Sequence, residues 1–291
     1  MRKVHKLHFG FTLIEMIMVI VITGILAGMV AVFIAKPVEG YADSVRRAEL
    51  TDAADVALRR MTRDVRRALP NSLRTVAGGF EFIMTKGGGK YRADGDGSSG
   101  AGINILSFTD SAKKSFDILG SPPSFGVGDF IFVYNLGDEP ADAYKYNGVS
   151  DSCSSSKGCN VVKATNATSP VTFNNNYFAG QSPPLPSPDS RFQVVGQNDK
   201  VVRYACPVAP ASGELTRTQG CDFADTATGC GVAARLAGSP SGESSTKASC
   251  VIDYVSAAIG RNGLLYISLT LTDTSGESVT LFQQIHVDNA P

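Results

Sequence analysis

The chain opens with an unbroken apolar stretch. Residues 11–35 carry Glu15 as their only charged side chain, and a helix over this range would span about 37 Å at 1.5 Å per residue. A cleavable secretory signal fits poorly, because the apolar region is long, a carboxylate lies near its start and residues 33–35 form no small-x-small cleavage site. The stretch therefore predicts a membrane-spanning helix that stays with the protein.

A second helical pattern follows. Lys36 and Pro37, with Gly40 close behind, predict an interruption after the apolar stretch. Over residues 41–69, apolar side chains recur at spacings of three and four and form one stripe of an amphipathic helix, namely Leu50, Ala54, Ala57, Leu58, Met61, Val65, Ala68 and Leu69. Three ion pairs have the i,i+4 spacing: Asp43 with Arg47, Asp55 with Arg59, and Arg60 with Asp64. We expect this helix to stop at Pro70 and Asn71.

From about residue 78 the pattern changes to short β-rich runs between turn-rich loops. We predict strands at residues 80–85, 103–109, 129–135, 201–206, 264–271 and 279–287. The last two are expected to form a hairpin, and loops 86–102 and 179–190 are expected to be surface excursions. Because no helical pattern separates the strands, the sequence predicts an α+β fold in which an antiparallel sheet is covered on one face by the amphipathic helix.

Charge changes this picture little. Basic and acidic residues number 27 each, and without Arg2, Lys3 and Lys6 the remainder would hold 24 basic against 27 acidic residues, a net charge of −3. A local basic cluster is formed by Arg59, Arg60, Arg63, Arg66 and Arg67. Acidic residues are interleaved and aromatic residues are absent there, which favours a solvated helix face or a subunit contact over a nucleic-acid or lipid-headgroup patch. We expect no nucleic-acid partner.

The cysteines indicate the compartment. All six lie in the middle and late chain: Cys153, Cys159, Cys206, Cys221, Cys230 and Cys250. An even number in Gly/Ser/Pro-rich loops predicts disulfides formed in an oxidising compartment such as the bacterial periplasm, with 15 possible connectivities. A zinc site is the alternative, but there is no Cys-x-x-Cys and His286 is the only histidine after position 8. Disulfides would place everything after residue 36 outside the cytoplasm.

The N-terminus resembles a known signature. A short basic leader ends at Gly10 and is followed by Phe11-Thr12-Leu13-Ile14-Glu15 and the apolar stretch, as in type IV pilins and the pseudopilins of type II secretion. The resemblance implies that a prepilin peptidase cuts after Gly10 and that the new N-terminus, Phe11, is methylated. It also implies that Glu15 pairs with this amine, on its own helix or on a neighbour's. An unpaired buried charge is costly, so the pair would fix the register of bundled helices. A single-pass signal anchor is the alternative.

The resemblance also implies an organisation for the whole chain. Residues 1–10 would be the leader, 11–36 the transmembrane and filament-core helix, 37–72 the amphipathic helix, and 73–291 a β-rich periplasmic head in a ladle-shaped, pilin-like fold. The partners would be prepilin peptidase, other major and minor pilins and the inner membrane, and the assembled protein would lie in a pilus at the cell surface.

Size and two further segments indicate a subtype. Removal of the leader from 291 residues would leave 281, more than a typical major pilin has, and a bulky head repeated throughout a filament would crowd its neighbours. Residues 36–72 and 281–291 resemble the MshO-type minor pilins of mannose-sensitive haemagglutinin pilus systems. The alternatives are a J-type minor pseudopilin of type II secretion and a tip adhesin or receptor that binds through the loops around the cysteines.

No catalytic constellation emerges, so neither an enzymatic activity nor a cofactor is expected. His286 with Asp288 is interpreted as a strand end, and the run GGGK at 87–90 as a turn, because it lacks the spacing of a phosphate loop. Asp94 and Asp96 are weak calcium candidates, since the terminal glutamate of an EF-hand is missing. The sequon that begins at Asn166 is interpreted as a chance match. A membrane-anchored periplasmic enzyme would need an active site that the sequence does not supply.

Overall fold

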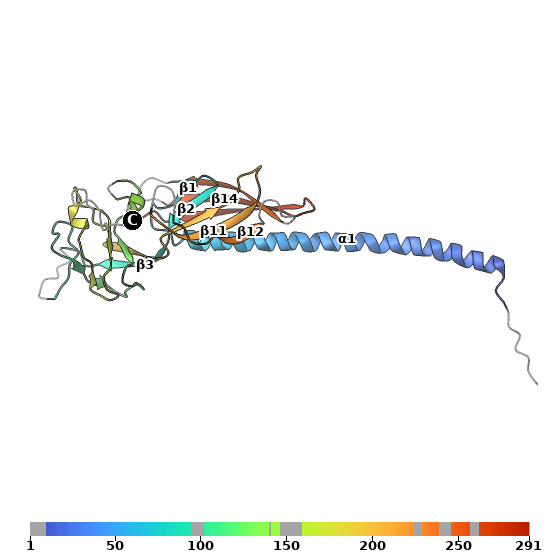
Figure 1. Cartoon of the computed structure of the whole chain (residues 1–291), viewed down its shortest axis with the longest axis horizontal. Helices are drawn as coiled ribbons and strands as arrows, with labels where there is room; N and C mark the ends of the chain where they lie inside the picture. Colours follow the sequence, from blue (N-terminus) through green and yellow to red (C-terminus); the bar gives the residue numbers. More distant parts are fainter. Residues whose placement is uncertain are drawn as a thin grey trace, which may run out of the picture. The chain divides into compact units, whose positions relative to one another are not determined.

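The computed structural model describes residues 10–94, 102–139, 141–145, 159–223, 229–238, 246–256 and 262–290 (Figure 1). The chain divides into two compact units, Met1–Glu49 and Leu50–Pro291. The first unit holds the N-terminal part of one long helix, and the second holds the end of that helix together with all of the β-strands.

The long helix, α1 (Leu13–Val65), begins directly after a capping threonine. The Glu15 backbone N–H donates to Oγ1 of Thr12 at 3.3 Å, and the Met16 N–H donates to the Thr12 carbonyl at 3.2 Å. Threonine is a favoured N-cap because its hydroxyl satisfies an N–H that has no partner inside the helix. Glu15 lies in the first turn, where the helix dipole favours negative charge.

The predicted interruption at Lys36 and Pro37 is wrong, because Pro37 lies inside α1. Proline removes one backbone hydrogen bond and crowds the carbonyl four residues earlier, which can bend a helix without ending it. The residues on both sides of Pro37 have helical patterns of their own. The two helices expected from the sequence are therefore one.

The helix ends at Val65, before the predicted stop at Pro70 and Asn71. Beyond it the chain joins a sheet edge: Ala68 forms an isolated antiparallel bridge with Met84, and the Leu69 N–H donates to the Ile83 carbonyl at 2.7 Å. The apolar spacing of the sequence continues to Ala68 and Leu69, but these two residues pair with a strand and are not part of the helix.

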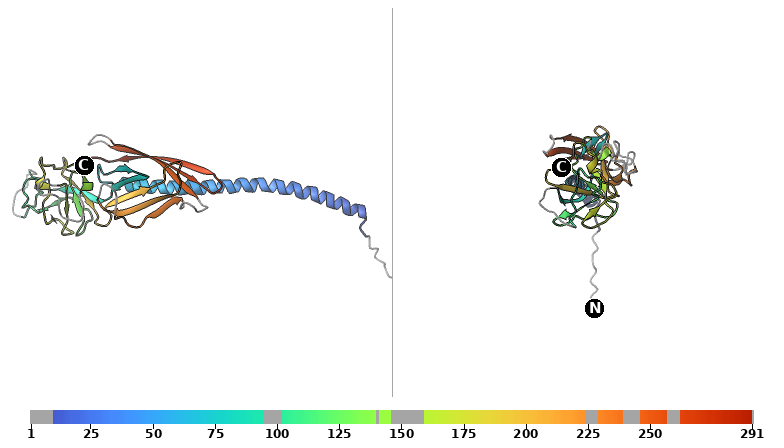
Figure 2. Two further views of the ribbon diagram at one scale, coloured as in Figure 1. Left: turned by 45° about the horizontal axis from the view of Figure 1, so that its top comes forward. Right: turned by 90° about the vertical axis from the view of Figure 1, so that its left-hand side faces the viewer.

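Two antiparallel sheets lie close to the end of α1. The first has the strand order β1-β2-β10-β11-β12, with bounds β1 Arg74–Val76, β2 Gly79–Ile83, β10 Val201–Ala205, β11 Glu214–Cys221 and β12 Ala234–Gly238. The second has the order β13-β14-β15, with bounds β13 Lys247–Val255, β14 Gly263–Thr272 and β15 Ser278–Val287. Figure 2 shows the second sheet in orange and red. The predicted hairpin of the last two strands is confirmed, with Leu269 opposite Leu281.

One hydrophobic core joins these sheets to the amphipathic stripe of α1. The stripe residues Leu50, Ala54, Ala57, Leu58, Met61 and Val65 are all buried there, together with side chains from β2, β10, β13, β14 and β15. Phe80 stacks on Tyr204 with ring centroids 5.0 Å apart. The prediction that the helix covers one face of an antiparallel sheet is confirmed, although the face is shared by two sheets.

The rest of the second unit is built on a third sheet with the order β5-β3-β9-β6-β7 and on a short pair, β4-β8. The strand bounds are β3 Thr85–Tyr91, β4 Ser115–Phe116, β5 Ile118–Leu119, β6 Phe130–Phe132, β7 Val161–Lys163, β8 Val171–Thr172 and β9 Arg191–Val195. Two single-turn 3₁₀ helices, η1 (Ala143–Lys145) and η2 (Phe178–Gly180), complete the described elements. An aromatic core holds this part together, with Phe116 packed edge-on against Phe192.

Three local predictions are wrong. The run GGGK is part of β3 and not a turn, so the loop predicted at 86–102 starts only after Tyr91. A Cβ on Gly88 would lie 2.8 Å from the Phe192 carbonyl oxygen, so glycine here permits the close pairing with β9. The strand predicted at 103–109 is replaced by an isolated bridge between Ala93 and Leu106.

Candidate functional site

The N-terminal segment holds the predicted processing residues. Gly10 and Phe11 precede α1 and lie outside any helix or strand, and Phe11 is 80% exposed. A Cβ added to Gly10 would meet no atom within 4 Å. Nothing in the described structure therefore requires glycine at position 10, so any such requirement comes from a binding partner.

The apolar stretch of α1 is exposed along its whole length. Fifteen of its large side chains are more than half exposed, namely Leu13, Ile14, Met16, Met18, Val19, Ile20, Val21, Ile22, Ile25, Leu26, Met29, Val30, Val32, Phe33 and Ile34. An 18-residue window of α1 has a mean hydropathy of 2.9 with none of it buried, which is long and apolar enough to cross a membrane. Soluble proteins rarely expose an apolar surface of this size, so we expect lipid or another protein to cover it.

Glu15 is the one charged side chain in that stretch. Within the described residues no basic group pairs with its carboxylate. A carboxylate in a bilayer costs about 2.5–3.5 kcal/mol on insertion scales, unless a cation compensates it. Glu15 therefore needs a cation that α1 itself does not supply.

A second acidic residue of the helix, Asp64, is fully compensated within its own unit. Its Oδ2 accepts hydrogen bonds from Arg217 Nε at 2.7 Å and from the Tyr204 hydroxyl at 2.8 Å. Burial and the Asp64 carboxylate raise the pKa of Tyr204 above its usual value. Burial alone would lower the pKa of Arg217, but the hydrogen bond and charge of Asp64 outweigh it and raise that pKa. The sequence had assigned Asp64 to Arg60, because spacing along a helix cannot reveal a partner on a distant strand.

The other two acidic residues of the predicted pairs also bind arginines of the helix. Asp55 pairs with Arg59 at 2.7 Å as predicted, and Asp43 pairs with Arg46 at the i,i+3 spacing. These pairs are exposed, so each contributes little to stability. Among the ion pairs of the described residues, the Asp64 pair links the helix to the sheets.

The disulfide prediction is confirmed for the described cysteines. Cys206 bonds to Cys250 and joins the end of β10 to β13, and Cys221 bonds to Cys230. Cys159 is also disulfide-bonded, and Cys153 lies outside the described residues. The first bridge joins the two sheets that share the helix-covered core, so it is a structural element of the head.

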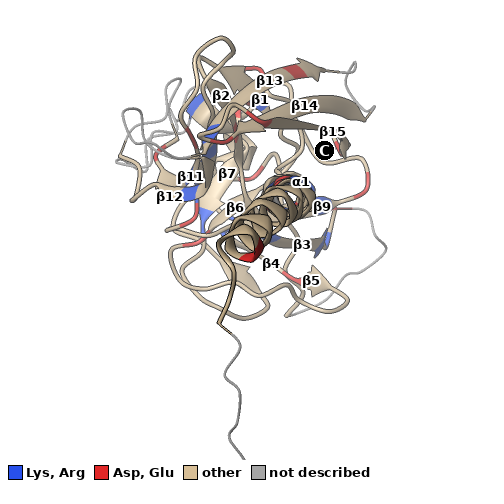
Figure 3. Ribbon diagram, turned by 90° about the vertical axis from the view of Figure 1, so that its right-hand side faces the viewer, with Lys and Arg blue, Asp and Glu red and all other residues tan. Residues whose placement is uncertain are grey.

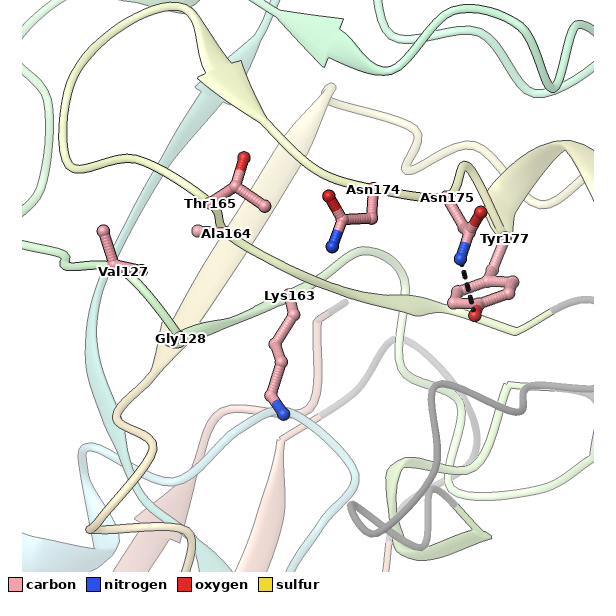
Figure 4. Close-up of a pocket in the computed structure, with 8 residues that line it drawn as sticks. All are labelled: Val127, Gly128, Lys163, Ala164, Thr165, Asn174, Asn175 and Tyr177. Carbon is pink, nitrogen blue, oxygen red and sulfur yellow. Dashed lines mark hydrogen bonds between the residues drawn. The ribbon is translucent and has the colours of Figure 1, made fainter.

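The head carries several surface cavities, one of which is rich in amide groups (Figure 4). It measures about 270 Å³ and is lined by Lys163 of β7, Thr165, Asn174, Asn175 and Tyr177, among others. Asn175 Nδ2 donates to the Tyr177 hydroxyl at 3.2 Å, while Asn174 is exposed. The lining offers hydrogen-bond donors and acceptors but no carboxylate, which suits a polar ligand better than a metal ion.

A larger cavity of about 680 Å³ lies beside the end of the helix. Arg60, Lys200 and Arg217 contribute positive charge to its lining, and Asp222 contributes the carboxylate. Lys200 Nζ donates to Asp222 at 2.7 Å, so of the three cations only Arg60 has no carboxylate partner among the described residues. In the ribbon of Figure 3, positions of basic residues (blue) and of acidic residues (red) both occur along the strands of this unit.

Among the described residues, the weaker sequence candidates are not brought together. Asp94 is exposed in a turn and Asp96 lies outside the described residues, within which no group of three or more His, Cys, Asp or Glu side chains could hold a metal. His286 is exposed on β15. The Asn166 amide donates to the carbonyls of Thr168 and Pro170 at 3.0 and 2.6 Å, so it holds its own loop together.

Comparison with known proteins adds one finding. Residues 6–31 match the family model described as the prokaryotic N-terminal methylation motif. The match spans Gly10, Phe11 and Glu15 and includes most of the exposed apolar stretch. Neither the curated proteins nor the solved structures contain a match to the chain. The chain thus carries a prepilin-type N-terminal motif, which supports a type IV pilin-like, membrane-anchored structural protein.

Proposed function

We propose that this protein is a subunit of a type IV pilus-like filament that prepilin peptidase cuts between Gly10 and Phe11. One observation carries the proposal: an exposed apolar helix with a single carboxylate, Glu15, starts directly after an unconstrained glycine within the matched motif. The motif implies methylation of Phe11 and assembly with other pilins. The head would lie in the periplasm before assembly.

Glu15 has a specific role in this proposal. Cleavage would create a positively charged amine at Phe11, four residues before the only carboxylate of the stretch. The pairing of this amine with Glu15 of the same or a neighbouring helix would compensate both charges in an apolar surrounding. Removing one partner leaves the other uncompensated, which makes the pair a determinant of helix register.

The test substitutes this carboxylate in cells that assemble the filament. Glu15→Ala is expected to leave leader removal intact and to reduce the amount of the protein in sheared filaments by about tenfold or more, since an uncompensated charge in an apolar bundle costs several kcal/mol. Glu39→Ala, an exposed acidic residue on the same helix, is the matched control and should assemble normally. Normal incorporation of the Glu15→Ala variant would contradict the proposal.

Within the filament we propose a minor subunit, most similar to the MshO type. A mature chain of 281 residues (291 minus ten) with a β-rich head supports this role, because such a head is more easily accommodated at low abundance or at a tip. A J-type secretion pseudopilin remains the alternative. Loss of pili on deletion supports the first, and loss of protein secretion with intact pili supports the second.

A second candidate function is that the head binds a surface or ligand, and the amide-lined cavity of Figure 4 favours it. Loop 179–190 is a poor target for the test, because Gln181 and Ser187 within it are buried. The double change Asn174→Ala with Asn175→Ala is expected to spare assembly and to abolish adhesion. Thr168→Ala, exposed outside the cavity, is the control, and unchanged adhesion in the double variant would count against this function.

A further inference from the structure

Two consecutive eleven-residue segments at the end of α1 repeat one pattern. Residues 45–55 read VRRAELTDAAD and residues 56–66 read VALRRMTRDVR. Both begin with an exposed valine, and both have a buried apolar residue at the sixth and tenth positions and threonine at the seventh, with the buried residues being Leu50 and Ala54, then Met61 and Val65. The two segments therefore present the same face to the core.

The repeats differ in charge at three matched positions. The fifth, eighth and eleventh residues are acidic in the first segment and basic in the second: Glu49, Asp52 and Asp55, then Arg60, Arg63 and Arg66. Eleven residues make about three helical turns at 3.6 residues per turn, so matched positions point in nearly the same direction. The helix thus carries an acidic patch followed by a basic patch of the same spacing.

These charges have little role in the fold of their own chain. Glu49, Asp52, Arg60, Arg63 and Arg66 are exposed, whereas Asp55 is half-buried and pairs with Arg59 of its own helix. Asp64, the one acidic residue among 59–67, is bound to Arg217, so in the described structure none of the three arginines has a carboxylate partner. Asp64 was the acidic residue interleaved with these arginines in the sequence, but its carboxylate binds Arg217 of β11 instead. Two valines of the same face are exposed as well, Val45 by 38% and Val56 by 59%.

We propose that this outer face of α1 (Val45, Glu49, Asp52, Asp55, Val56, Arg60, Arg63 and Arg66) docks on the outer face of a second copy whose helix runs parallel and is displaced by eleven residues. The displacement is about 16 Å at 1.5 Å per residue. It places Val45 against Val56, Glu49 against Arg60 and Asp52 against Arg63, and it brings Arg66 beside the Asp55–Arg59 ion pair. An undisplaced parallel pair would instead oppose like charges.

The parallel direction rests on the proposed function, because subunits anchored in one membrane or filament point the same way. Because both patches lie on the same face of the helix, a third parallel helix would overlap with the first, so the contact joins two copies through the acidic patch of one and the basic patch of the other. Pairs of opposite charge between the two helices determine the eleven-residue displacement more than they strengthen binding. Other displacements would place like charges together, which is unfavourable. The contact requires two copies to be neighbours, whatever their share of the filament.

Reciprocal charge reversal in the full chain tests the proposal. A benzophenone amino acid at Val56 is expected to crosslink two copies in membranes, with the second attachment point mapped near Val45. Asp52→Arg and Arg63→Asp are each expected to lower the crosslink about tenfold, because each creates a like-charge contact. The chain with both changes should regain it. Asp253→Arg, which reverses an exposed charge on β13, is the control and should crosslink normally.

Three results would overturn the proposal: attachment at Val56 of the second copy, attachment to a different protein, and no recovery in the double variant. The intact mass of the same sample reports leader removal independently. A processed chain in which charge reversal has no effect would refute the displaced docking alone. A chain that keeps its leader would refute the proposed function, while the crosslink would still test the docking.

Discussion

The two parts of α1 have the same conformation and opposite environments. Over residues 50–65, apolar side chains recur every three or four positions and are buried against two sheets. Over residues 13–34, they occupy nearly every position and are exposed. Burying one large apolar side chain contributes about 1.5–3 kcal/mol. In the described structure residues 13–34 obtain little of this contribution, so lipid or other helices must cover them.

The largest contrast concerns the two carboxylates Asp64 and Glu15. Asp64→Ala should lower the free energy of unfolding of the head by about 3–5 kcal/mol, because it leaves Arg217 buried and unpaired. Glu15→Ala should leave that free energy unchanged, since the Glu15 side chain is exposed. Denaturant unfolding of the full chain in detergent, followed by tyrosine fluorescence, measures both. Equal losses of unfolding free energy in the two variants would contradict this contrast.

The apolar residues give the next contrast. Met61→Ala removes a buried side chain that is 1% exposed, and should destabilise the head by about 2–5 kcal/mol through lost transfer energy and a cavity. Ile22→Ala removes a side chain that is 55% exposed and should not change head stability. The same unfolding measurement applies, and a loss in Ile22→Ala comparable with that in Met61→Ala would show that the first part also packs on the head.

The Cys206–Cys250 bridge sharpens the description of the head. Its replacement by two serines should destabilise the head by about 2–4 kcal/mol, because 44 residues separate the cysteines in sequence and the unfolded chain becomes freer. The second bridge, Cys221–Cys230, closes a much shorter loop of 9 residues and should contribute less. Thermal unfolding of the two variants measures the order, and a reversed order would contradict this reasoning.

The smallest effect is on pH dependence. Burial raises the pKa of Tyr91 to about 12, and its hydroxyl accepts a hydrogen bond from the Ser187 N–H. Since the folded pKa exceeds the usual tyrosine pKa of 10.0, the contribution of Tyr91 to stability is complete below pH 10 and declines as the pH rises from about 10 to 12. The melting temperature of Tyr91→Phe should therefore fall less steeply over this window than that of the unchanged chain. An identical slope would contradict the assignment.

The sequence predicted the features that depend on local periodicity. The stripe from Leu50 to Val65, the final hairpin and the antiparallel α+β class all follow from spacing, and the structure confirms them. Gly10, Phe11 and Glu15 could be proposed as sites because a short contiguous motif carries them.

Features that depend on tertiary context could not be predicted. Gly88 and Gly89 pair closely with β9, where atoms of Phe192 leave no room for a side chain on either residue. Nothing within GGGK indicates this close pairing. Strands β11 and β13 were missed because their apolar residues alternate with small and charged ones. The partner of Asp64 lies 153 residues away in sequence, and Pro37 continues the helix where a local rule predicts a break.

The central claim is that the exposed part of α1 becomes the N-terminus of a processed, membrane-inserted subunit. The intact mass of the protein, extracted from cells with and without prepilin peptidase, tests it directly. We predict a chain that begins at N-methylated Phe11 and lacks ten residues in the first strain, and the full chain in the second. A chain that begins at Met1 in both strains would contradict the claim.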